Sequence, residues 1–170
     1  MIPPGLPILI AEDDEDEALL LVHALKAIGI SNPVLMVDNG EHVIAYLKGE
    51  GQFTDREAFP LPAVLITDLK MPAVDGFELL EWLRHHPQFA IIPTLVFSNS
   101  SEPQDIQRAY SLGANAYLVK PPGMEQLEAM MRTTFEFWTL CARTPFASDR
   151  QGETRPEAQL AAPQGQLFPV

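Results

Sequence analysis

Short apolar runs alternate with amphipathic stretches along most of the chain. The runs at 6–11, 33–37, 63–67, 93–97 and 116–119 are four to six residues long and predict buried strands. Between and after them, apolar residues recur at helical spacing near 18–28, 43–47, 77–83, 106–112 and 124–142, which predicts five helices. Residues 49–62 carry turn residues without a clear period and predict a surface loop.

This alternation predicts the fold class. Strands separated by helices form parallel βαβ units, and runs that are apolar on both faces indicate strands covered on both sides. We therefore expect an α/β fold: a doubly wound five-stranded parallel sheet of order 2-1-3-4-5, flavodoxin-like. Residues 1–143 are expected to form this one domain. Residues 144–170, rich in Pro, Gln, Gly and charged side chains, are expected to be a flexible tail without an output domain.

Chemically active side chains follow four of the predicted strands. Glu12 and Asp13 follow the first, Asp68 the third, Ser98 the fourth and Lys120 the fifth. In such a sheet the ligand site lies at the carboxyl ends of the strands, beside the switch point between the first and third. Crowded carboxylates raise one another's pKa unless a hard divalent cation such as Mg²⁺ relieves the repulsion. With a hydroxyl and an ammonium, the set predicts a phosphoryl-transfer site.

Each of these residues taken alone is more typical of a turn, a helix cap or a solvated surface. Asp68 after a strand, or Lys120 before a proline, is weak evidence. The prediction depends on all of them falling at the same edge of one sheet.

The acidic run AEDDEDE at 11–17 divides into parts. Glu12 and Asp13 are the candidate metal ligands, and Asp14 is the expected N-cap of the first helix. Glu15, Asp16 and Glu17 (the first helical turn) are expected to interact only with the helix dipole, by about 0.3–1 kcal/mol each. Only the first two acids of the run are thus expected to carry chemistry.

Charge and composition exclude several classes. The formal net charge is −12, with 23 acids against 11 Lys and Arg, so binding of nucleic acid through its phosphates is not expected. Cys141 is the only cysteine, which leaves no internal disulfide and no thiolate zinc cluster. Nothing approaches about 18 consecutive apolar residues, so a cytoplasmic protein without membrane association is expected.

The stretches ILIAEDD, LITDLKMPAVDGFELL, IPTLVFSNSS and GANAYLVKPP resemble the response-regulator receiver domain of two-component signalling. The resemblance implies that Asp68 accepts a phosphoryl group from a sensor histidine kinase. It also implies that Mg²⁺, or Mn²⁺ in its place, is bound by Glu12, Asp13, Asp68 and the backbone carbonyl of Lys70.

The same resemblance assigns the remaining site residues. Ser98 and Lys120 would bind the phosphoryl oxygens, and Ser98 together with Tyr117 would form the switch. The peptide bond between Lys120 and Pro121 would be cis, aiming the lysine at the site. The protein would then be a phosphoacceptor with self-phosphorylation and autodephosphorylation only, and not an enzyme acting on other molecules.

Finer features resemble the stand-alone regulators paired with phytochrome-type kinases. These are the DLKMPAVDG loop, the insertion at 49–62 and the FEFW run at 135–138. A bacteriophytochrome-type light-sensing kinase is therefore the expected partner. A second apolar stripe on the last helix predicts a homodimer through the fourth helix, the fifth strand and the last helix, with Phe135, Phe137 and Trp138 as candidates. Coverage of this stripe by the C-terminal arm is the alternative.

Other functions share parts of this pattern. A phosphate sink that drains the kinase, and a receiver that binds proteins without phosphorylation, remain alternatives. Phosphatases of the haloacid-dehalogenase type need a second acid two residues after the nucleophile, where this chain has Lys70. A flavodoxin is disfavoured because the acids after the first strand would repel the FMN phosphate.

Overall fold

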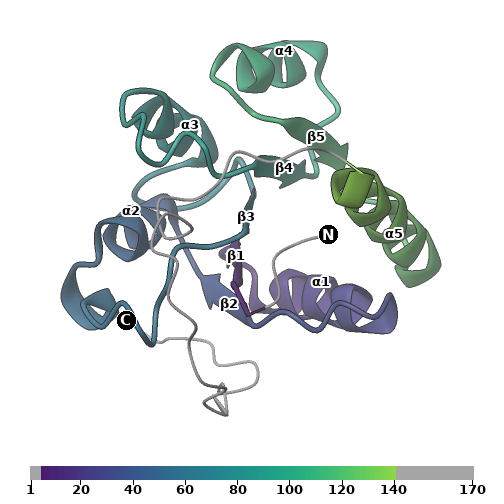
Figure 1. Ribbon diagram of the computed structural model, residues 1–170. Coiled ribbons are helices and arrows are strands. Elements are labelled where there is room, and N and C mark those ends of the chain that lie inside the picture. The colour runs from purple at the N-terminus through teal and green to yellow at the C-terminus, as the bar shows by residue number, and fades with distance from the viewer. Residues whose placement is uncertain (1–4, 141–170) are drawn as a thin grey trace.

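A computed structural model describes residues 5–140 of the chain, and it contains the predicted parallel sheet with strand order β2-β1-β3-β4-β5 (Figure 1). The expected fold class and strand order are confirmed. The sheet consists of β1 (Ile8–Ala11), β2 (Val34–Val37), β3 (Val64–Thr67), β4 (Thr94–Ser98) and β5 (Ala116–Val119).

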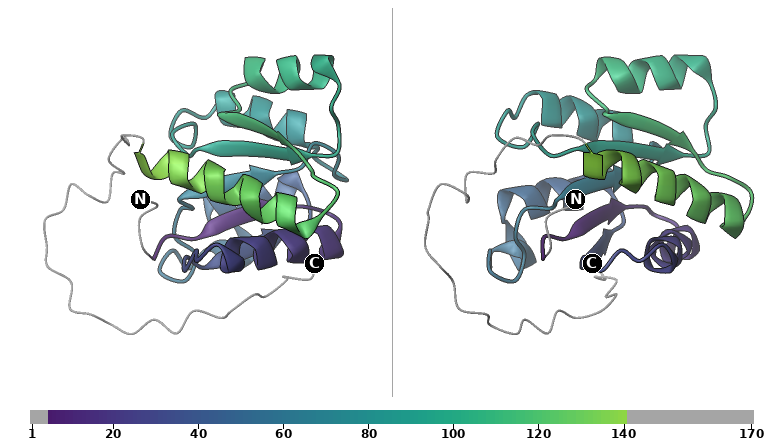
Figure 2. Two further views of the ribbon diagram at one scale, coloured as in Figure 1. Left: turned by 90° about the vertical axis from the view of Figure 1, so that its right-hand side faces the viewer. Right: turned by 45° about the vertical axis from the view of Figure 1, so that its right-hand side comes forward.

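The helices cover both faces of this sheet. Helices α1 and α5 lie together on one face, while α2, α3 and α4 lie on the other (Figures 1 and 2). Their bounds are α1 (Glu15–Ala27), α2 (Gly40–Lys48), α3 (Gly76–Arg84), α4 (Pro103–Ser111) and α5 (Met124–Leu140). In the described part of the chain, no helix combines the length and apolar character needed to cross a membrane.

Prolines explain why two strands begin one residue later than the apolar pattern suggested. Pro33 and Pro93 precede β2 and β4 and have no N–H to contribute to a ladder. Their carbonyls still accept hydrogen bonds from Ile8 at 2.8 Å and Leu65 at 2.9 Å. The prolines therefore sit at the entry to the sheet.

Every residue of β1 is buried, as expected for a strand covered on both sides. Ile8 and Ile10 pack among the residues beneath α1 and α5. Leu9 and Ala11 pack with the residues beneath α2 and α3. The apolar run before the acids thus anchors both layers of the core and fixes where Glu12 emerges.

The segment 49–62 is a surface loop with a defined packing. It contains a short 3-10 turn at Gly51–Phe53, and the ring of Phe53 is almost fully buried. The Phe53 ring centroid lies 5.1 Å from that of Tyr46 and 5.4 Å from that of Phe59, both in edge-to-face geometry. Arg56 donates to the Tyr46 carbonyl at 2.8 Å, which caps the end of α2.

Helix α5 presents one stripe to the core and another to the surface. Leu127, Met131 and Phe135 are buried against the sheet and α1. Phe137 is 61% exposed and Leu140 is 87% exposed. The expectations for Cys141 and for the tail at 144–170 concern residues outside the described part of the chain.

Candidate functional site

Three charged side chains meet at the carboxyl edge of the sheet. The Nζ atom of Lys120, just after β5, lies 2.6 Å from Oε2 of Glu12 and 3.0 Å from Oδ2 of Asp68. All three side chains are less than a tenth exposed. Because β1 and β3 are central neighbours in the sheet, the acids that follow them are held close together by the ladder itself.

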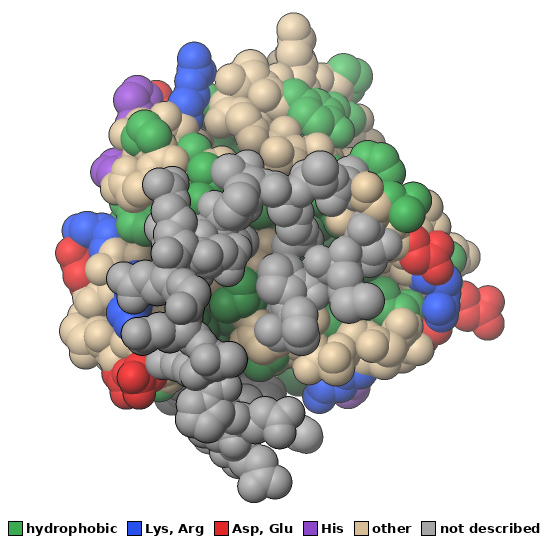
Figure 3. All heavy atoms as spheres, viewed as in Figure 1, with side chains coloured by type: hydrophobic (Ala, Val, Ile, Leu, Met, Phe, Trp, Pro, Cys, Tyr) green, Lys and Arg blue, Asp and Glu red, His purple; other side chains and the backbone are tan. Residues whose placement is uncertain are grey.

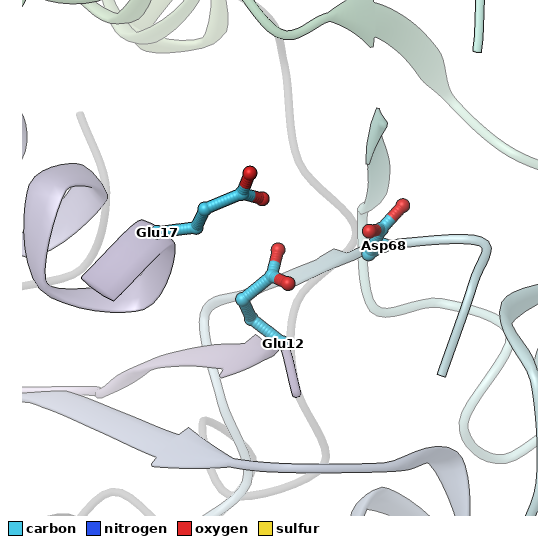
Figure 4. Close-up of side chains that lie close together, drawn as sticks. All are labelled: Glu12, Glu17 and Asp68. Carbon is cyan, nitrogen blue, oxygen red and sulfur yellow. The ribbon is translucent and has the colours of Figure 1, made fainter. Parts of the chain in front are cut away.

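Glu17 is a fourth member of this group, and the sequence reasoning missed it. Its carboxylate forms an ion pair with Lys120, and carboxylate oxygens of Glu12, Glu17 and Asp68 lie within 4.8 Å of one another (Figure 4). The expectation that Glu17 serves only the helix dipole was wrong. Glu17 is the third residue of α1, a position whose side chain reaches back across the helix N-terminus.

The start of α1 otherwise follows the prediction. The Asp14 side chain accepts hydrogen bonds from the amides of Asp16 at 2.9 Å and Glu17 at 3.1 Å, so Asp14 is the N-cap. The amide of Asp14 in turn donates to Oε1 of Glu12 at 3.3 Å. The cap therefore also helps to orient the buried carboxylate beside it.

Asp68 is held by the loop that follows β3. The amide of Leu69 donates to Oδ1 of Asp68 at 2.5 Å, which leaves Oδ2 for Lys120. The amide of Gly76 donates to the Leu69 carbonyl at 3.0 Å and closes the loop tightly. Within it, Ala73 has a φ of 60°, a left-handed conformation that costs an ordinary residue about 1–2 kcal/mol.

Two of the predicted metal ligands lie at the surface of this site. Asp13 is exposed next to the buried Glu12, and Lys70 is exposed two residues after Asp68. The three acids whose oxygens the structure brings closest together include Glu17 in place of Asp13. The assignment of Asp13 and of the Lys70 carbonyl as ligands stays a prediction.

The predicted switch residues lie on the neighbouring strands. Ser98 is buried at the end of β4, and its carbonyl accepts from the Lys120 amide at 2.9 Å. The Tyr117 hydroxyl donates to the Ser100 carbonyl at 2.9 Å, which ties β5 to the loop after β4. Burial raises the pKa of Tyr117, so the phenol stays protonated and can act as this donor.

The expected cis peptide bond is not present. None of the described peptide bonds is cis, so the bond between Lys120 and Pro121 is trans. With this trans bond, the amide of Lys120 continues the ladder to Ser98, and the lysine side chain still reaches the carboxylates. The aim of the lysine is set by strand pairing and its ion pairs.

The electrostatics of the cluster are dominated by burial and by Lys120. Burial raises the pKa of Glu12 to about 7, although the hydrogen bond and charge of Lys120 oppose the rise. For Lys120, burial alone lowers the pKa, but its hydrogen bonds to Glu12 and Glu17 outweigh burial and raise the pKa overall. The ammonium is therefore protonated and faces three acids.

These donors suit a hard divalent cation. The acids outnumber the one ammonium among them, and they offer the oxygen ligands that Mg²⁺ and Mn²⁺ take. Glu12 and Asp68 supply buried carboxylate oxygens at the end of the central strands. The site therefore fits a divalent metal ion beside the Asp68 carboxylate.

Comparison with known proteins agrees with this geometry. Residues 8–132 match the family model described as the response regulator receiver domain. The chain is 29% identical over 145 residues to the response regulator Rcp1 of Synechocystis sp., covering 85% of this chain and 96% of Rcp1. A solved Mn²⁺-bound form of Rcp1 matches with a TM-score of 0.72 at 28% identity, covering 83% of this chain and 99% of that one.

Two further solved structures extend the likeness. The response regulator RPA3017 in red light signaling of R. palustris has a TM-score of 0.77 at 33% identity, covering 82% of this chain and 98% of that one. The phosphorylated cyanobacterial phytochrome response regulator RcpA has a TM-score of 0.74 at 30% identity, covering 83% and 99%. These matches and the acidic site at the end of β3 show that the chain belongs to the response regulator receiver domain family.

Proposed function

We propose that this chain is a response regulator that accepts a phosphoryl group on Asp68 from a sensor histidine kinase. The observation that carries the proposal is the Asp68 carboxylate at the end of β3, with Oδ2 lying 3.0 Å from the Lys120 ammonium. A nucleophilic carboxylate beside a fixed cation and a metal-compatible acid pair suits phosphoryl transfer. RcpA, a relative, has been solved in a phosphorylated form.

The chemistry follows from the groups in place. An Asp68 carboxylate oxygen attacks phosphorus and forms a P–O bond while the P–N bond to the kinase imidazole breaks, its electron pair passing to the nitrogen. Lys120 and the Ser98 hydroxyl bind the phosphoryl oxygens and offset their charge. A bound Mg²⁺, held by Glu12, Asp13, Asp68 and the Lys70 carbonyl, would supply further charge neutralisation.

Labelling with acetyl phosphate and Mg²⁺ tests this proposal. Wild-type protein should acquire a hydroxylamine-sensitive acyl phosphate, and Asp68→Asn should not. Asp16→Asn is the matched control, because Asp16 is an exposed acid in the first turn of α1 and should label as wild type does. Label on Asp68→Asn at the wild-type rate would disprove the assignment.

We also propose that the kinase is of the phytochrome type and that the exchange takes place in the cytoplasm. The support is the likeness to RcpA, a phytochrome response regulator, and to RPA3017, a regulator in red light signaling. Phosphotransfer from a purified phytochrome-type kinase should be at least about tenfold faster than from a kinase of another class. Equal rates from both would contradict this choice of partner.

A homodimer through α4, β5 and α5 is the third part of the proposal. Four exposed large apolar side chains among the described residues lie on these elements: Tyr110, Val119, Phe137 and Leu140. Figure 3 shows hydrophobic side chains in this region, over β5 and the end of α5. An isologous contact uses the same surface on both copies, so it would bury these four side chains on each copy.

One of the three residues expected in the interface needs correction. Phe135 is only 4% exposed and packs in the core with α1, so it is not available to a second copy. Phe137 remains a candidate, and Trp138 is half-buried at the core's edge. Sedimentation should show a dimer that Tyr110→Ala with Leu140→Ser weakens, whereas the exposed Ile91→Ser leaves it intact.

A further inference from the structure

We propose that Glu17 is a positioning residue that holds the Lys120 ammonium before phosphorylation, so that the phosphoryl group must displace it. The inference rests on the proposed function, and it makes the Glu17 carboxylate a competitor of the phosphoryl group for Lys120. Lys120 lies among the carboxylates of Glu12, Glu17 and Asp68. Of these, Glu17 alone comes from a helix rather than from the end of a sheet strand.

The three acids differ in solvent exposure, and this difference indicates which of them can release Lys120 most easily. The side chains of Glu12 and Asp68 are 5% and 8% exposed, whereas that of Glu17 is 36% exposed. A carboxylate that is about a third exposed regains water at little cost when it loses its partner, whereas a buried one does not. Glu17 is therefore the acid that can release Lys120 most easily when phosphoryl oxygens arrive.

Glu17 also forms a hydrogen bond with the residue that follows β4. The Asn99 side-chain amide donates to Oε1 of Glu17 at 3.4 Å, while Oε2 faces Lys120. Asn99 directly follows β4, so the Glu17 carboxylate bridges the first turn of α1 and the loop that precedes α4. Release of Lys120 by Glu17 would loosen this bridge together with the ion pair.

The charge balance gives the direction of the effect. A phosphoryl group on Asp68 attracts the Lys120 ammonium, for which the Glu17 carboxylate competes. Replacing Glu17 by a neutral side chain removes this competitor. Occupancy of the site by a phosphoryl group should then become more favourable.

Beryllofluoride with Mg²⁺, a stable phosphoryl analogue, provides an equilibrium test by ¹⁹F NMR titration of the full chain. Glu17→Gln should lower the half-saturating concentration roughly five- to tenfold, as expected when one partly exposed hydrogen bond no longer competes. Glu15→Gln is the matched control, since it removes the same charge from the same exposed helical turn and should bind as wild type does.

A double-mutant cycle distinguishes the proposed action of Glu17 through Lys120 from a merely structural role of Glu17. In a Lys120→Met background, Glu17→Gln should change binding by less than about twofold, because the lysine that transmits the effect is gone. Glu17→Asp keeps the charge with a shorter reach and should fall between wild type and Glu17→Gln. An equal gain with and without Lys120 would overturn the inference.

The remaining outcomes are also distinguishable. A Glu17→Gln protein that binds Mg²⁺ alone more than about tenfold more weakly would make Glu17 a metal ligand and overturn the positioning role. Wild-type protein that binds beryllofluoride while Glu17→Gln binds it equally would refute only this inference. Wild-type protein that neither binds beryllofluoride nor labels with acetyl phosphate would refute the proposed function itself.

Discussion

Gly76 lies directly against the backbone of Asp68: a Cβ atom at position 76 would be 2.2 Å from the Asp68 carbonyl oxygen. It would also lie 2.7 Å from the Leu69 Cα, so backbone atoms would have to move on both sides. Gly76 is the first residue of α3, and its close approach brings that helix up to the end of β3. The position of the candidate phosphoacceptor therefore depends on the absence of a side chain on another element.

Gly76→Ala should destabilise the protein by about 1–3 kcal/mol, even though alanine is the better helix former, because the clash is with backbone that cannot swing away. Urea unfolding measures the loss, and the labelling rate with acetyl phosphate should fall with it. Gly123→Ala is the control, since its Cβ would meet only the flexible end of the Gln126 side chain. Equal stability of the two variants would contradict this account.

Lys120 should determine how strongly the fold depends on a divalent cation. It is 6% exposed and neutralises neighbouring acids, so Lys120→Met should cost about 3–5 kcal/mol without metal. Saturating Mg²⁺ should recover more stability in this variant than it adds to wild type, because the ion replaces the missing charge. Urea unfolding with and without Mg²⁺ measures both effects.

Lys48→Met provides the comparison for this prediction. Lys48 pairs with Glu50 at 2.5 Å, but both side chains are about half exposed. Loss of that surface pair should cost less than about 1 kcal/mol and should leave the Mg²⁺ effect unchanged. A Lys120→Met protein that gained no more from Mg²⁺ than Lys48→Met would contradict the role given to Lys120.

Tyr46 should anchor the segment at 49–62. Its side chain is fully buried, and its hydroxyl donates to the Pro60 carbonyl at 2.6 Å. Tyr46→Phe leaves that carbonyl without its donor and should cost about 1–3 kcal/mol in urea unfolding. At the half-exposed Tyr110, the hydroxyl accepts a hydrogen bond from the Tyr117 amide at 3.1 Å. Tyr110→Phe should cost under about 0.5 kcal/mol, because water can replace this exposed hydrogen bond.

The apolar pattern was sufficient to predict the fold because the three central strands β1, β3 and β4 are buried along their whole length. A continuous run such as Ile8–Ala11 has few alternatives to a central strand, and a parallel sheet then places the following acids at one edge. The convergence of Glu12, Asp68 and Lys120 follows from topology alone. Strand ends were less certain wherever a proline stood at the boundary.

The pattern of apolar and polar residues could not predict contacts that depend on how far a single side chain reaches. Glu17 has the sequence environment of an ordinary first-turn acid, and only the folded structure brings the Lys120 side chain, which follows β5, to it. The order of 49–62 likewise comes from Phe53, Phe59 and Arg56 meeting the end of α2, contacts that follow no sequence period.

Substitution of the two phenylalanines near the end of α5 should have different effects, because one lies in the core and the other at the surface. Phe135 is 4% exposed and packs with α1, so Phe135→Ala should cost about 3–5 kcal/mol of unfolding free energy. Phe137 is 61% exposed, so Phe137→Ala should cost clearly less in the monomer and should act instead on the sedimentation of the dimer. Urea unfolding at a concentration where the protein is monomeric, beside sedimentation at high concentration, measures the two effects separately. Similar losses of monomer stability in both variants would contradict the packing of α5, and an unchanged dimer in Phe137→Ala would remove Phe137 from the interface.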